Sequence, residues 1–138
     1  MITVADIINA VTAKLGENFP EVRIWSTDKD KDFGEKCFFI KYTASRDGKP
    51  EFVHDYGQIR LYYFPSDNKI NRIELLDVQE RLSELFLFRI FVNDDFAVPI
   101  NELEFEIDDD VLTMSFDFDM YQMPTEDITP AMEKLEIN

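Results

Sequence analysis

The sequence has 138 residues, of which 45% are apolar and 14% aromatic, and its formal net charge at pH 7 is −15. This length and this apolar content are typical of one globular domain with its own core, and they exclude an acidic disordered tail. No run approaches the roughly 18 apolar residues of a membrane span, and no secretory signal pattern opens the chain. We therefore expect a single domain over residues 1–138 that folds in the cytoplasm and binds no membrane.

The negative charge is concentrated in the last third of the chain. Residues 1–93 contain 15 acidic and 13 basic side chains, whereas residues 94–138 contain 14 acidic side chains and Lys134 as the one base. Duplex binding depends on Lys and Arg side chains that neutralise phosphates, so an acidic surface repels nucleic acid. We expect no direct nucleic-acid binding, while avoidance or mimicry of nucleic acid stays open.

The first predicted element is a helix over residues 4–18. Thr3 and Asp6 have the spacing of a variant capping box, and apolar residues then recur at helical spacing. Pro20 prevents the helix from continuing, and a short strand is predicted around residues 22–25.

Two long strands are predicted next, after a polar loop at residues 26–36. Residues 37–44 carry β-branched and aromatic side chains on both faces, which indicates a central strand or an interface. A turn at residues 46–50 leads to a second strand over residues 52–64, where Gly57 is expected to mark a bulge.

A second helix is predicted after residues 65–68, which break the strand and offer N-cap side chains. The helix ends near residue 85, and its apolar stripe consists of Leu75, Val78, Leu82 and Leu85. Short strands around residues 88–92 and 96–98 flank a turn, and Pro99 is expected to interrupt the chain after them.

The last predicted hairpin has one apolar and one acidic face, because apolar and polar residues alternate along both strands. Keeping the two apolar sets on one side requires Ile107 opposite Leu112. That register makes residues 108–111 a four-residue loop and places Phe105 beside Met114.

The polar side of this hairpin carries five acidic candidates for an interaction face: Glu102, Glu104, Glu106, Asp117 and Asp119. The register sets Glu102 opposite Asp117, and like charges across a ladder destabilise it by a few tenths of a kcal/mol. The acidic face must therefore be well hydrated.

These elements predict an α+β domain with a mixed or mainly antiparallel sheet and two main helices packed on one face. From about residue 124 a short tail follows, with one helical turn in which Met132 and Leu135 are the main candidates for burial.

No motif indicates catalysis or a cofactor. His54 is the sole histidine and Cys37 the sole cysteine, and no local pattern pairs either one with a catalytic partner. Both are expected to be structural. A glycine-rich phosphate loop is absent as well, so we expect a protein that is not an enzyme and binds no cofactor.

Metal binding is also not expected. Residues 28–34 resemble the start of a calcium loop, but Phe33 takes the glycine position and Phe39 the position of the closing glutamate. The aspartates at residues 94–95 and 108–110 lie at predicted hairpin tips, where Asp is favoured for turn geometry alone.

Four aromatic residues are candidates for subunit contacts, because exposed aromatics anchor protein interfaces. They are Trp25, Phe33, Tyr62 and Phe64. Ordinary core packing is the alternative for each of them.

Taken in order along the chain, several segments resemble the tail terminator family of phages and prophages of Gram-positive bacteria. They are the opening helix 2–15, Phe19-Pro20, the segment CFFIK at 37–41, Tyr63-Phe64-Pro65, the hairpin 107–112, the run 114–121 and the closing segment 132–138. Each segment is a packing or turn pattern, and it is their order and spacing that carry the resemblance over essentially the whole chain.

The resemblance implies a structural subunit that forms a ring, a hexamer, on the head-proximal end of a finished tail tube. Such a ring stops tube polymerisation and contacts the tail tube protein on one side and a neck or head-completion protein on the other. The subunit would be made in the host cytoplasm and end in the tail of the virion. Rings of this kind can form on the tube alone and leave a monomer in solution.

Two further hypotheses concern the acidic residues. In a tail tube they would line the lumen and repel the DNA that passes through, whereas the simpler alternative is a sheet face that meets solvent. A different class of function is an acidic DNA mimic that binds and inhibits a basic host protein, with a strong dependence on salt.

Overall fold

The computed structural model describes residues 2–25, 36–65 and 72–123, and its helices and strands follow the predicted order along the chain. The elements are α1 (Val4–Asn18), β1 (Arg23–Trp25), β2 (Cys37–Gly48), β3 (Val53–Phe64), α2 (Arg72–Phe86), β4 (Arg89–Asn93), β5 (Phe96–Asp108) and β6 (Val111–Gln122).

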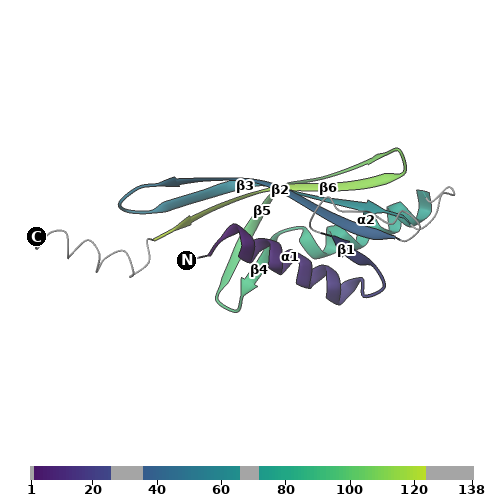
Figure 1. Cartoon of the computed structure of the whole chain (residues 1–138), viewed down its shortest axis with the longest axis horizontal. Coiled ribbons are helices and arrows are strands. Elements are labelled where there is room, and N and C mark those ends of the chain that lie inside the picture. The colour runs from purple at the N-terminus through teal and green to yellow at the C-terminus, as the bar shows by residue number, and fades with distance from the viewer. Residues whose placement is uncertain (1, 26–35, 66–71, 124–138) are drawn as a thin grey trace, which may run out of the picture.

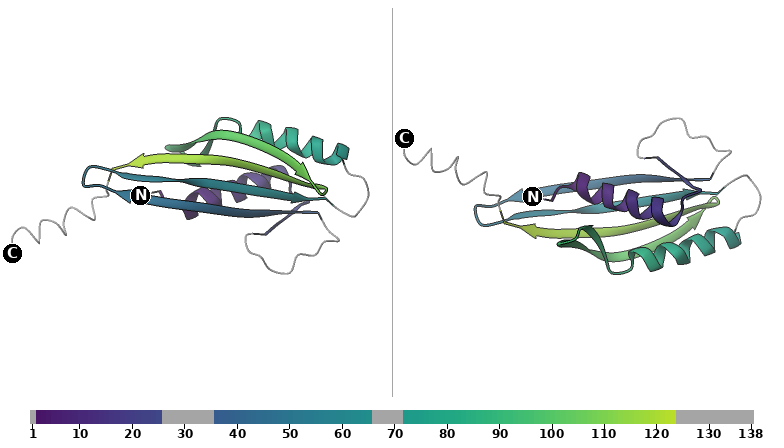
Figure 2. Two further views of the ribbon diagram at one scale, coloured as in Figure 1. Left: turned by 90° about the horizontal axis from the view of Figure 1, so that it is seen from above. Right: turned by 90° about the horizontal axis from the view of Figure 1, so that it is seen from below.

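These elements form two layers (Figure 1). One layer is a six-stranded sheet with the strand order β1-β2-β3-β6-β5-β4. The other layer consists of α1 and α2, which lie side by side on one face of the sheet (Figure 2). The pair β1 and β2 is parallel and the other pairs are antiparallel. The structure therefore confirms an α+β fold with a mixed sheet and both helices on one face.

Helix α1 begins and ends at the predicted residues. The Thr3 backbone N–H donates to Asp6 Oδ2 at 2.8 Å and the Asp6 N–H donates to Thr3 Oγ1 at 3.2 Å, which is a complete capping box. Its buried side chains Ile7, Val11 and Leu15 face the sheet at the predicted spacing.

The pair of β2 and β3 is longer than predicted, because residues 46–48 belong to β2 and not to a turn. Arg46 Nε donates to Asp55 Oδ1 of β3 at 2.6 Å, and this pairing continues the ladder past the polar residues. Low strand propensity at polar positions is overridden by a cross-strand ion pair. The hairpin then closes with a hydrogen bond of 2.8 Å from the Lys49 N–H to the Phe52 carbonyl.

Gly57 marks no bulge, because β3 pairs without a register shift on both of its sides. Its role is to admit a neighbouring backbone. A Cβ atom at this position would lie 2.0 Å from the Thr43 carbonyl oxygen and 2.9 Å from the Ala44 Cα. The predicted bulge was wrong, and close approach of β2 is the reason for glycine here.

Helix α2 buries Leu75, Val78 and Leu82 as predicted, but its last core residue is Phe86 and not Leu85. Both positions follow Leu82 at helical spacing, so periodicity alone does not separate them. The Phe86 ring stacks on Phe116 of β6 with centroids 6.3 Å apart, which explains why Phe86 and not Leu85 is the buried residue. The predicted N-cap positions 66–68 lie outside the described residues.

Pro99 does not interrupt the chain, since β5 is one strand from Phe96 to Asp108. Pro99 pairs with Arg89 of β4, and the next residue, Ile100, pairs with Phe118 of β6. The proline thus lies where β5 changes partners, a place at which its missing N–H costs least. The Ile100 N–H donates to the Phe88 carbonyl at 3.0 Å and completes the connection.

The hairpin of β5 and β6 has the predicted register, with Ile107 opposite Leu112 and Phe105 opposite Met114. Its loop is shorter than predicted, because Asp108 pairs with Val111. Asp109 and Asp110 form the turn alone, with φ angles of 51° and 62°. Two consecutive left-handed residues are typical of a type I′ turn, which Asp tolerates better than most residues.

The core lies between the sheet and the two helices. The rings of Phe19 and Phe38 meet edge to face at 5.0 Å, and Tyr63 lies 5.1 Å from Phe38. The Tyr63 hydroxyl donates to Glu74 Oε2 of α2 at 2.5 Å. Burial, together with this hydrogen bond, raises the pKa of Tyr63 well above its usual value.

Asp55 is the one fully buried charged residue among those the structure describes. Besides the Arg46 guanidinium it accepts a hydrogen bond of 3.3 Å from Gln122 Nε2. The Gln122 side chain also bonds the N–H and the carbonyl of Ile2, at 2.7 Å and 2.8 Å. This network fastens the start of the chain to β3 and β6. The predicted tail with Met132 and Leu135 lies outside the described residues.

Candidate interaction face

The face of the sheet opposite α1 and α2 carries the predicted acidic residues. Along β6, Leu112, Met114 and Phe116 are buried against the helices, so the residues between them point to the other side. The pairing extends this alternation to the neighbouring strands. We call this side the open face, and its members are Lys41, Thr43, His54, Tyr56, Gln58, Arg60, Glu104, Glu106, Thr113, Ser115, Asp117, Asp119 and Tyr121.

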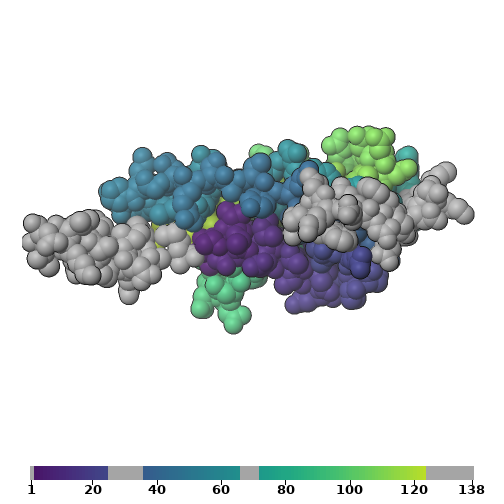
Figure 3. Space-filling view, in the orientation of Figure 1, coloured from purple at the N-terminus to yellow at the C-terminus, as the bar shows by residue number. Residues whose placement is uncertain are grey.

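No described helix covers the open face. The β2–β3 hairpin extends past the N-terminal end of α1, which Figure 3 shows in the space-filling view. The polar and charged side chains named above therefore project from the side of the sheet away from the helices. Cys37 and Phe39, at the start of β2, lie on the same side and are buried.

Four of the five predicted acidic residues lie on this face at ladder positions. Glu104 pairs with Ser115 and Glu106 pairs with Thr113, while Asp117 and Asp119 follow at alternate positions of β6. Glu104 and Glu106 of β5 therefore face hydroxyl side chains of β6, so no two carboxylates lie directly opposite each other at these two positions.

Glu102 departs from the predicted register. Asn101, and not Glu102, pairs with Asp117, and the register shifts between Asn101 and Glu104. Glu102 has a φ of 53°, which marks an irregularity that strict alternation does not reveal. Glu102 nevertheless lines the same hollow of the face as Asp117.

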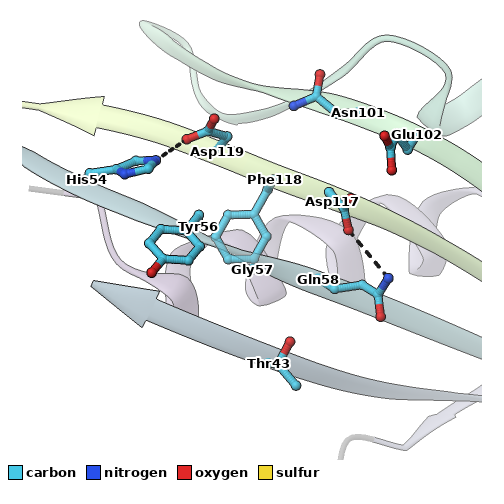
Figure 4. A pocket seen from close by; sticks show the side chains of 10 residues that line it. All are labelled: Thr43, His54, Tyr56, Gly57, Gln58, Asn101, Glu102, Asp117, Phe118 and Asp119. Carbon is cyan, nitrogen blue, oxygen red and sulfur yellow. Dashed lines mark hydrogen bonds and ion pairs between the residues drawn. The ribbon is translucent and has the colours of Figure 1, made fainter. Parts of the chain in front are cut away.

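This hollow has a volume of about 790 Å³ and is lined by residues of β2, β3, β5 and β6 (Figure 4). Two of its carboxylates already have partners from β3: Asp119 contacts His54 Nε2, and Asp117 Oδ1 accepts from Gln58 Nε2 at 3.4 Å. The side chains are thus fixed by each other and form a shaped polar surface.

His54 is held in an aromatic stack at the hairpin end of the face. Its ring lies parallel to Tyr121 at 4.1 Å and 4.8 Å from Tyr56, and Phe52 meets Tyr121 at 5.6 Å. Cys37 is buried at the other end of β2, where it pairs with Phe64, whereas His54 pairs with Asp47. The two candidates for nucleophilic chemistry are therefore far apart.

The open face also carries positive charge, which the sequence did not reveal as a feature. Lys41 pairs with Arg60 across β2 and β3, Arg60 pairs with Ser115, and Ser115 pairs with Glu104. One row across the sheet therefore runs from a base at β2 to an acid at β5. Arg60 Nε donates to Gln58 Oε1 at 2.8 Å, which orients the guanidinium along the face.

Three of the predicted subunit-contact aromatics lie near one another in the sheet, because Trp25 and Tyr62 both pair with Phe39 and Phe64 follows Tyr62 by two residues on β3. Tyr62 is half-buried and its ring lies 6.3 Å from Phe39, and Phe64 is also partly buried. Trp25 belongs to β1, and Phe33 lies outside the described residues. Their use in subunit contacts stays a prediction.

Within residues 2–25, 36–65 and 72–123, no three His, Cys, Asp or Glu side chains are placed to share a metal ion. Neither α1 nor α2 has the length and apolar character of a membrane span. The calcium-like run 28–34 lies outside the described residues.

Comparison with known proteins identifies what this chain is similar to. A family model described as "Phage tail terminator protein" matches residues 6–130. The match includes α2 and every described strand, and all of α1 except its first two residues. The comparison with curated proteins gave no match.

Proposed function

The chain belongs to the phage tail terminator family, and we propose that it caps the head-proximal end of the tail tube and joins the tail to the head. Members of this family have a structural role in the phage tail and interact with tail and head proteins. The specific proposal is that binding of this protein to a tube end stops further addition of tube subunits.

The family match is the single observation that carries this proposal. The fold supports it, because the open face joins charged and aromatic side chains that suit contacts with other proteins. We further propose that the protein acts as a hexameric ring and that the tube end templates the ring, which leaves a monomer in solution.

We also propose that the open face lines the lumen of this ring. Glu104, Glu106, Asp117 and Asp119 would then face the DNA that leaves the head and keep it from adhering. The alternative is a face that meets bulk solvent outside the ring. Replacement of Asp117 and Asp119 with Lys distinguishes these two positions of the open face. The lumen proposal requires slower DNA delivery from otherwise normal particles.

An inhibitor that mimics DNA is the competing function, and one observation speaks against it. Such a mimic needs an uninterrupted set of carboxylates in place of phosphates. Here Lys41 and Arg60 lie in the same row as Glu104, so the open face is of mixed charge.

The capping proposal is tested by assembling tubes from purified tail tube protein with and without this chain. We expect shorter tubes in its presence and the chain bound at one tube end, seen by negative-stain electron microscopy. Bovine serum albumin at the same concentration serves as the control for crowding. Tubes of unchanged length, with no bound chain, would overturn the proposal.

A further inference from the structure

Strand β5 has a long stretch that is paired on one side only. Up to Pro99 it pairs with β4, and from Ile100 to Asp108 it pairs with β6. Among the described residues, no strand pairs with the outer side of residues 101–108. A row of unpaired N–H and C=O groups at the edge of a sheet is a template for the addition of a further strand.

The pairing pattern identifies which backbone groups face outward. The hairpin of β5 and β6 has a two-residue turn, closed by Asp108 and its pair on β6. In such a hairpin the closing pair exchanges hydrogen bonds, and every second pair after it does the same. The backbone groups of Glu104 and Glu106 therefore bond β6, whereas the N–H and C=O groups of Phe105 and Ile107 point to the outer side.

On the open face this edge is acidic. Glu104 and Glu106 are exposed there, and on β6 they oppose Ser115 and Thr113. A hollow of about 220 Å³ runs beside the two carboxylates, lined by Glu104, Phe105, Glu106, Thr113 and Ser115. Lys or Arg side chains of an added strand would lie next to Glu104 and Glu106, and opposite charges across a ladder stabilise it.

On the helix side the same edge is apolar. Leu103 and Phe105 are partly buried against the core, and Ile107, which pairs with the buried Leu112, is 38% exposed. An added strand needs apolar side chains beside them, because a polar group there would lose water without gaining a partner.

Helix α2 provides a surface under such a strand. Both views of Figure 2 place α2 outside the β5 edge of the sheet. Glu74 of α2 bonds Tyr63 in the interior, and Leu76 lies about 200° around the helix from Glu74. Leu76 is therefore on the outer flank of α2, and it is 50% exposed. A strand added to β5 would lie over this flank and bury Leu76 together with Ile107.

A second copy of β5 does not suit this edge. Glu104, Glu106 and Asp108 follow each other at alternate positions of the strand. Two β5 edges that keep their apolar residues on one side would therefore place carboxylates opposite carboxylates in each register, which destabilises the pair. The charges select a strand in which basic residues alternate with apolar ones.

We propose that residues 101–108 of β5 bind an extended segment of another protein in which basic and apolar residues alternate. The segment adds a strand to the sheet, with its backbone bonded to Phe105 and Ile107. Its basic side chains contact Glu104 and Glu106 on the open face, and its apolar side chains pack toward α2. The inference rests on the proposed function for the source of the segment, which is a tail or head protein.

Binding of a labelled peptide tests the edge. The probe is a short peptide, blocked at both ends, in which lysine and valine alternate, and fluorescence anisotropy measures its dissociation constant. Glu104→Lys/Glu106→Lys should weaken binding by about tenfold or more and should instead bind a peptide of alternating glutamate and valine. Asp94→Lys/Asp95→Lys makes the same charge change at the turn of β4 and β5 and should weaken binding by less than about threefold. Circular dichroism melts establish that each variant is folded.

Modified peptides separate strand addition from attraction of charge alone. Only one side of an added strand faces β5, so N-methylation of one alternate set of peptide amides should abolish binding, and methylation of the other set should preserve it. Loss with the valine set means antiparallel addition, and loss with the lysine set means parallel addition. Equal binding of both methylated peptides would overturn the proposal. So would equal binding of a peptide of the same composition with its lysines grouped at one end.

Amide exchange locates the added strand on the protein. At a peptide concentration of about ten times the dissociation constant, the amides of Phe105 and Ile107 should exchange about tenfold more slowly. Those of Glu104 and Glu106 should change little, because they already bond β6. Unchanged exchange at Phe105 and Ile107 would contradict the proposal. Protection of both amides without peptide, in a chain that sediments as a dimer, would also contradict it, because a second copy would then occupy the edge.

The peptide assay uses this chain alone, so its outcome is independent of tube capping. If the unmodified chain caps tubes and does not bind the alternating peptide, the edge proposal is wrong and the function stands. If the chain binds the peptide and does not cap tubes, the proposed function fails and the peptide-binding edge stands.

Discussion

At the scale of single residues, the sequence identifies unusual positions more readily than it explains the structural role of each. Gly57 stands out inside a strand, but the bulge expected there is absent and the cause is the backbone of β2. The structural role expected of His54 fits its stack with Tyr121. The burial of Asp55 was not predictable from the sequence. Its partner Arg46 was assigned to a turn, and its partner Gln122 is distant along the chain.

Gly57 gives the first residue-level prediction. Gly57→Ala should lower the free energy of unfolding by about 2 kcal/mol or more, because the new methyl group meets backbone atoms that have little room to move. Urea denaturation measures the change. Gly16→Ala is the matched control: apart from the backbone of its own helix, no described part of the chain lies within 4 Å of the added methyl group, and alanine should stabilise α1 by up to about 1 kcal/mol. Equal stability of Gly57→Ala and the unmodified chain would contradict this account.

Tyr63 predicts a dependence of stability on pH. Its pKa in the folded chain is raised by burial and by the bond to Glu74, while the unfolded phenol titrates near pH 10. The unfolded state therefore loses its proton first, so the stabilisation is complete below about pH 10 and falls as the pH rises further. Urea midpoints at about pH 8 and about pH 11 should differ less for Tyr63→Phe than for the unmodified chain. Identical differences would rule out this role for Tyr63.

At the scale of elements, the sequence predicts best where a period is uninterrupted. Helix α1 and the register of β5 and β6 between Glu104 and Ser115 follow from spacing alone, because each buries one regular stripe. The errors fall where tertiary contacts override a local signal. An ion pair extends β2 through residues 46–48, and a change of strand partner accommodates Pro99.

A single substitution should weaken the capping box of α1. Thr3→Ala removes the hydroxyl that accepts from the Asp6 N–H and should cost about 1 kcal/mol of stability. Thr12→Ala, inside the same helix, is the control and should be neutral or slightly stabilising. The test is the difference in thermal midpoint between the two variants, and no difference would mean that the cap contributes nothing.

At the scale of the whole molecule, the fold is a layer of helices under a sheet with one open face and an edge of β5 that lacks a strand partner over residues 101–108 within the described part of the chain. Alternation in the sequence was enough to place Glu104, Glu106, Asp117 and Asp119 on one face. The row from Lys41 to Glu104 was not predictable, because it depends on the register of four strands at once. Sequence patterns report which face a residue takes within a strand, and the order of strands decides its neighbours.

The most direct test of the account is electron microscopy of tails produced by the phage or prophage with and without the gene for this chain. We predict tails of uniform length with the protein as a ring at the head-proximal end when it is present. Without it, the tails should be overlong and unattached to heads, and supply of the gene in trans should restore them. Tails of normal length that join heads in its absence would contradict the central claim.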